Sequence, residues 1–157
     1  MGLGHPGILA IPGRKAGIGG SSEAVGLLAC VAVSYIRDSM YADFRAKDRW
    51  SGEEIRCTYQ ALIVAIATRH ADAVDIKFLA NGQPVWIALP HPAWVEYNKR
   101  TGKILNDALA VEIAGHYLKW AIESGEGIGR EMYTLTVEET LKHLDELARE
   151  AHALQAK

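Results

Sequence analysis

Residues 74–89, near the middle of the chain, constrain the fold more than any other stretch. Apolar residues recur at every second position from Val74 to Phe78 and again from Val85 to Leu89, which is the periodicity of strands with one buried face. Asn81-Gly82 separates the two runs, and this dipeptide favours the type I′ turn of a tight hairpin. The chain is therefore expected to contain an antiparallel sheet with an apolar face.

The other expected elements surround this hairpin. A third strand is predicted over residues 94–97, giving a three-stranded antiparallel meander, and a short strand is predicted over residues 132–135. Helices are predicted over residues 24–36, 51–70 and 104–124 and from Thr136 onward, with an amphipathic helical stretch that includes Met40, Tyr41 and Phe44.

Two capping boxes support the helix starts, Ser51 with Glu54 and Thr136 with Glu139. Residues 24–36 are apolar on all sides and are expected to form the central buried helix, although a buried strand from Cys30 to Ile36 stays open. We expect a single α+β domain over residues 1–157, with the three-stranded meander packed against about four helices.

Composition limits the classes of partner. The 157 residues carry a net charge of −2, which argues against nucleic acid as a partner because such proteins need a basic face. The longest apolar run is too short to span a membrane. No basic leader precedes an apolar stretch at the start, and the two cysteines show no C-x-x-C spacing. A cytoplasmic location is therefore expected.

A glycine-serine loop precedes the predicted helix over residues 24–36. Glycines allow close approach of a ligand, while serine hydroxyls and the free N–H groups of a helix N-terminus donate to an anion. The residues that would hold a small anionic ligand are Arg14, Lys15, Gly17, Gly19, Gly20, Ser21 and Ser22. The alternative is a flexible N-terminal arm over residues 1–20 that is joined to a capped helix.

The stretch from Gly17 to Ser22 resembles the glycine-serine phosphate loop of the GHMP-type small-molecule kinases. That family places a substantial sheet before its loop, whereas about sixteen residues precede the loop here. The resemblance therefore implies phosphate binding at most, and the kinase activity is not carried over.

A metal site is a further alternative. Glu112 and His116 share one face of the helix predicted over residues 104–124, at a spacing that metal ligands use. The same face carries Lys119 and Glu123, so a solvated polar stripe explains the pattern equally well. Glu139 and His143 are expected to form an exposed pair on the last helix.

The aromatic residues of the meander suggest a contact surface. Trp86 alternates with Val85 and Ile87, so it points to the opposite face of the sheet, and Trp94 follows nearby. Exposed aromatic residues on a sheet mark interfaces. Trp86 and Trp94 are therefore predicted to lie in a contact between copies of this chain.

These observations favour a homo-oligomeric binding or interaction module, because the sequence contains no evident catalytic motif. Two alternatives remain open. One is an enzyme or ligand-binding domain for a phosphorylated or carboxylated small molecule at the Gly17–Ser22 loop. The other is a metal-binding protein that uses Glu112 and His116. Whether the protein is an enzyme is left open.

Overall fold

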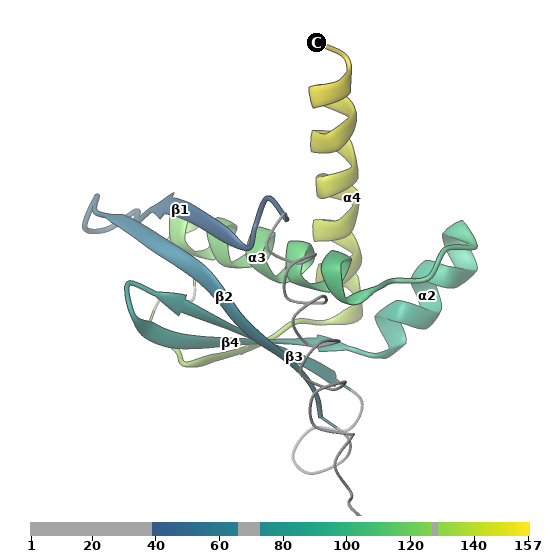
Figure 1. Ribbon diagram of the computed structural model, residues 1–157, viewed down its shortest axis with the longest axis horizontal. Helices are drawn as coiled ribbons and strands as arrows, with labels where there is room; N and C mark the ends of the chain where they lie inside the picture. The colour runs from purple at the N-terminus through teal and green to yellow at the C-terminus, as the bar shows by residue number, and fades with distance from the viewer. Residues whose placement is uncertain (1–38, 66–72, 127–128) are drawn as a thin grey trace, which may run out of the picture.

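The computed structural model describes residues 39–65, 73–126 and 129–157, which form five strands and three helices (Figure 1). In chain order the elements are β1 (Asp43–Lys47), β2 (Glu54–Ala65), β3 (Ala73–Ala80), β4 (Gln83–Pro90), α2 (Pro92–Thr101), α3 (Asp107–Ser124), β5 (Met132–Thr134) and α4 (Val137–Gln155).

The strands form one sheet in the order β1-β2-β3-β4-β5. The first four are antiparallel neighbours, and β5 joins β4 in parallel. The α+β class is confirmed, but the three-stranded meander with about four helices is wrong. The described residues contain a five-stranded mixed sheet and three helices instead.

The predicted hairpin is the β3–β4 pair, in which Ala80 pairs with Gln83. Asn81 and Gly82 both have positive φ, at 47° and 83°, as a type I′ turn requires. The turn is also tied to β2, because the backbone N–H of Arg56 donates to Asn81 Oδ1 over 2.9 Å.

The predicted helix over residues 51–70 is wrong where the structure describes it, because Glu54–Ala65 is strand β2. The strand pairing is irregular between Tyr59 and Ala61, which indicates a bulge. The bulge shifts the alternation by one residue, so Ile55, Tyr59 and Leu62 all pack against the core. Their spacing of four and then three residues imitates a helix.

The expected cap at Ser51 belongs to a turn rather than to a helix. Its backbone N–H and its hydroxyl both donate to the carboxylate of Asp48. Its predicted partner Glu54 begins β2 and accepts from Arg45 of β1 over 2.8 Å.

Two further predictions are wrong in the type of element: one predicted helix is a strand, and one predicted strand is part of a helix. The stretch with Phe44, predicted as helix, includes strand β1, which pairs with β2. The strand predicted over residues 94–97 lies inside helix α2. Proline stands in the first turn of α2, where its missing N–H costs nothing, and Gly102 ends the helix in the left-handed conformation.

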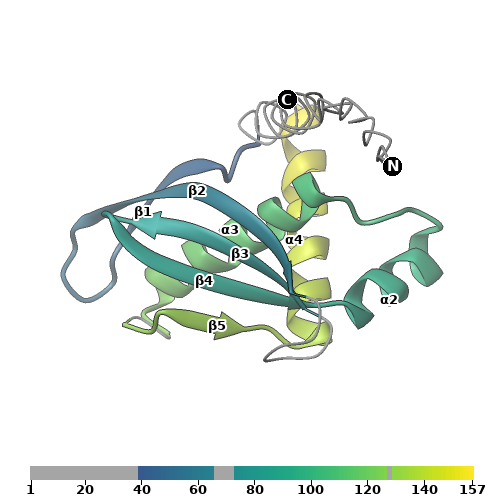
Figure 2. The same cartoon turned by 60° about the horizontal axis from the view of Figure 1, so that its bottom comes forward.

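Helix α3 packs against one face of the sheet (Figures 1 and 2). The core between them includes Ile76, Phe78 and Ile87 from the strands and Val111 and Ile113 from α3. The predicted helix over residues 104–124 is thus confirmed, with Asn106 as its N-cap. Helix α4 packs on α3 and projects beyond the sheet toward the C-terminus (Figure 1).

Several predictions fall outside the described residues. They concern the N-terminal arm over residues 1–20, the glycine-serine loop with Arg14 and Lys15, the central element over residues 24–36, and the last residues of the stretch predicted as helix up to residue 70. Among the described helices, none combines the length and the apolar character that crossing a membrane demands.

Candidate metal site

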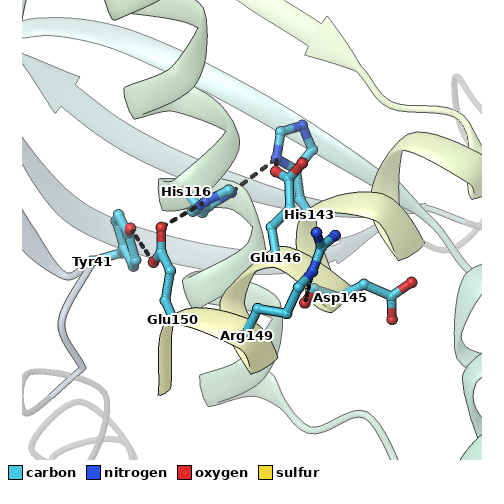
Figure 3. Close-up of polar contacts among 7 residues, drawn as sticks. All are labelled: Tyr41, His116, His143, Asp145, Glu146, Arg149 and Glu150. Atoms are coloured by element: carbon cyan, nitrogen blue, oxygen red, sulfur yellow. Dashed lines mark hydrogen bonds and ion pairs between the residues drawn. The ribbon is translucent and has the colours of Figure 1, made fainter. Parts of the chain in front are cut away.

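Two histidines from different helices meet in the interior. His116 of α3 and His143 of α4 place their Nδ1 atoms 2.8 Å apart (Figure 3). The residues are 8% and 2% exposed. A hydrogen bond between two ring nitrogens needs one donor and one acceptor, so one Nδ1 carries a proton and the other presents a lone pair.

A carboxylate completes the group. Glu146 lies one turn after His143 on α4, and its Oε2 is 3.6 Å from His143 Nδ1. One ligand atom from each of His116, His143 and Glu146 can be chosen so that all three lie within 4.8 Å of one another. The Glu146 side chain is 31% exposed, so the group reaches the surface on that side.

Further residues orient His116 from its other side. The Oε1 atom of Glu150 lies 3.6 Å from His116 Nε2. The hydroxyl of Tyr41 donates to Glu150 Oε2 over 3.2 Å (Figure 3). Burial, followed by the charge of Glu150, raises the pKa of Tyr41, so the phenol keeps its proton and stays a donor.

Aromatic rings enclose His143. The ring of Tyr117 meets it edge-on, with the centroids 5.4 Å apart, and the ring of Trp120 lies at 5.7 Å. Burial, and then the neighbouring His116, lower the pKa of His143 to about 4. At neutral pH His143 is therefore an uncharged imidazole, the form that binds metal ions.

The distance between the two Nδ1 atoms is slightly shorter than the distance between two nitrogen ligands of a tetrahedral metal ion. With zinc–nitrogen bonds of 2.0–2.1 Å, two ligand nitrogens stand about 3.3 Å apart. The two Nδ1 atoms must separate by roughly 0.5 Å. The ring that carries the Nδ1 proton must also change tautomer, so that its proton lies on Nε2 and its Nδ1 presents a lone pair. The Nε2 of His116 would then donate to Glu150, which is the carboxylate–histidine arrangement found behind metal ligands.

The candidate ligand group differs from the alternative metal site that the sequence suggested through Glu112 and His116. His116 belongs to the group, but its partners are His143 and Glu146, and the group does not include Glu112. The expected exposed pair of Glu139 and His143 is wrong, because His143 is buried. Glu139 instead accepts from Thr136 in the predicted capping box at the start of α4, which is confirmed.

The two tryptophans named as interface residues lie on different elements. Trp86 is half-buried on β4, and the ammonium of Lys77 stands 5.4 Å from its ring centroid. Trp94 lies on α2, close to the ring of His91. Their role in a contact between copies stays a prediction, as does anion binding by the loop over residues 17–22.

Comparison of the chain with protein-family models, with curated proteins and with solved structures found no match.

Proposed function

We propose that the protein binds one divalent transition-metal ion of the zinc type between α3 and α4. The ligands would be Nδ1 of His116, Nδ1 of His143 and the carboxylate of Glu146. The observation that supports this most is that two buried imidazoles aim the same nitrogen at one point, 2.8 Å apart, with a carboxylate beside them.

The donor set selects the kind of ion. Imidazole nitrogens suit zinc, copper, iron and nickel, whereas magnesium and calcium prefer oxygen ligands alone. Three protein ligands leave a fourth position for water or a small ligand, as in zinc sites that react. An ion held by two helices would also fix α4 on α3.

Isothermal titration of the full chain with zinc chloride tests this proposal. We expect one zinc per chain for the wild type, with magnesium giving no heat. His143→Gln should abolish this binding, and Glu146→Gln should weaken it. Glu150→Gln changes the residue behind His116 and leaves the three proposed ligands in place, so it should weaken zinc binding about 10- to 100-fold.

The matched controls lie on the same helix. His152 and Glu138 are exposed residues of α4, so His152→Gln and Glu138→Gln should leave the titration unchanged. Equal zinc binding by the wild type and His143→Gln would place the ion elsewhere, for example at His5 or His70, and would overturn the proposal.

A second candidate function, an interaction module that pairs with its own copies, is favoured by the outer face of the sheet. Lys77, Trp86 and Met132 are register partners on neighbouring strands, so their side chains share one face. Ile63 joins this face through its pairing with Asp75. Ile63 and Met132 are both exposed.

Sedimentation velocity tests this second candidate. If the outer face pairs two copies, Met132→Glu should convert a dimer into a monomer. The control is Ile104→Glu, because Ile104 is an exposed apolar residue away from the sheet, between α2 and α3. A monomeric wild type, or a dimer that Met132→Glu leaves intact, would rule it out.

A further inference from the structure

Helix α4 and its neighbours form an apolar groove of about 330 Å³. The residues that line it are Met40, Tyr97, Leu109, Glu112, Leu144, Leu147, Ala148, Ala151 and Leu154. Met40 is 54% exposed and Leu154 is 65% exposed. The C-terminal turns of α4, where Leu154 lies, stand clear of the sheet (Figure 1).

An exposed apolar surface of this kind is typical of a docking site, where another segment or molecule covers it. Among the described residues that line the groove, only Glu112 is charged. The occupant should therefore be apolar and uncharged, and it should be long enough to follow the groove along α4.

The chain itself contains such a segment. Residues 24–36 read AVGLLACVAVSYI, thirteen residues without a charge. The segment ends at Ile36, four residues before Met40, which lines the groove. Four extended residues span at most about 14 Å, so the segment is tethered beside the groove. Such a short tether gives an effective concentration on the order of millimolar.

We propose that one side of the segment formed by residues 24–36 of the same chain packs over this groove, against Leu144 and Leu147 of α4 and the side chain of Met40. The apolar segment would remove the exposed surfaces of Met40 and Leu154 from water. This inference does not depend on metal binding, because none of the three proposed metal ligands lines the groove.

Cysteine cross-linking in the full-length chain tests the placement. Cys30 lies in the middle of the segment, and Cys57 is fully buried on β2. Ala151 is an exposed lining residue, so Ala151→Cys adds a thiol to the groove without disturbing the core. A short bismaleimide, added in the presence of EDTA, should join Cys30 to the new thiol within one chain.

The control places the thiol on the other side of the same helix. Ala153 is exposed and does not line the groove, so Ala153→Cys should give at least tenfold less cross-linked monomer. Cys30→Ser combined with Ala151→Cys should give none. Equal yields from Ala151→Cys and Ala153→Cys, or cross-links confined to dimers, would overturn the proposal.

Discussion

Gly115 allows the chain before β1 to lie directly on helix α3. A Cβ atom at this position would stand 2.5 Å from Cβ of Tyr41 and 2.9 Å from its carbonyl oxygen. Real Cβ atoms do not approach other atoms so closely. The absence of a side chain at Gly115 therefore brings Tyr41 to where its hydroxyl reaches Glu150.

Gly115→Ala should lower the free energy of unfolding by about 1–3 kcal/mol, because the backbone of Tyr41 cannot move away cheaply. Without that contact, the same substitution inside a helix would stabilise the protein by about 0.5–1 kcal/mol. Urea unfolding distinguishes the two by sign, and a stabilised variant would contradict the close approach.

The His143 side chain should make stability depend on pH. Its pKa is 6.5 when unfolded and about 4 in the folded protein, so the unfolded state binds more protons between these values. The contribution of His143 to the free energy of unfolding is therefore fully present above pH 6.5, and it is lost as the pH falls from 6.5 toward 4. The groups that act on this pKa are His116, Glu146, Lys142 and Glu139.

Between pH 7 and pH 5, the metal-free wild type should lose about 2 kcal/mol of unfolding free energy through His143. Urea unfolding in EDTA at the two pH values measures this loss. His143→Gln removes the titrating group and should reduce the pH dependence by that amount. An unchanged pH dependence in the variant would show that the folded protein accepts a proton on His143 readily.

Helix α4 begins at a capping box that the sequence predicted. The Thr136 hydroxyl accepts from the Glu139 backbone N–H over 3.1 Å, and the Glu139 carboxylate accepts from the Thr136 backbone over 2.8 Å. Because His143 and Glu146 both lie on α4, the cap supports the helix that carries two of the three proposed ligands.

Thr136→Ala should cost about 1 kcal/mol, the usual loss for removing an N-cap side chain. Thr136→Ser keeps the hydroxyl and should stay close to the wild type in the same thermal or urea unfolding measurement. Equal destabilisation by both substitutions would mean that the Thr136 methyl group, rather than the cap, stabilises the helix start.

Helices and strands with a strong local sequence signal could be predicted from the sequence alone. The β3–β4 hairpin, α3 and α4 each have a local signal: an Asn-Gly turn, a long apolar helix with a polar stripe, and a capping box. Strand β2 has a misleading one, since the bulge after Tyr59 gives Ile55, Tyr59 and Leu62 a helical spacing. The pairing of this segment with β1 and β3, which local sequence does not show, makes it a strand rather than a helix.

The same distinction holds for the candidate metal site. His116 could be singled out by its spacing from Glu112, but its partner His143 is 27 residues away. Nothing local in the sequence shows that α3 and α4 bring the two rings together. The sequence pattern pairs His143 with Glu139 on an exposed face of the last helix, and it gives no sign that His143 is buried.

At the scale of the whole molecule, α4 is attached to the rest largely through α3 and α2, and the proposed ion would add a link between α3 and α4. Zinc at 100 times its dissociation constant should then add about 2.7 kcal/mol to the free energy of unfolding. Thermal unfolding with and without zinc measures this gain, which His143→Gln should remove. If zinc raised the free energy of unfolding of His143→Gln by the same amount, the ion would not link α3 to α4 through His143.

The most direct measurement is zinc X-ray absorption on the loaded full-length protein and on His143→Gln. The proposed site predicts two imidazole nitrogens at about 2.0–2.1 Å, together with oxygen ligands at about 2.0–2.2 Å. His143→Gln should fail to retain zinc. A wild-type spectrum without imidazole ligands, or one that His143→Gln leaves unchanged, would contradict a metal site between α3 and α4.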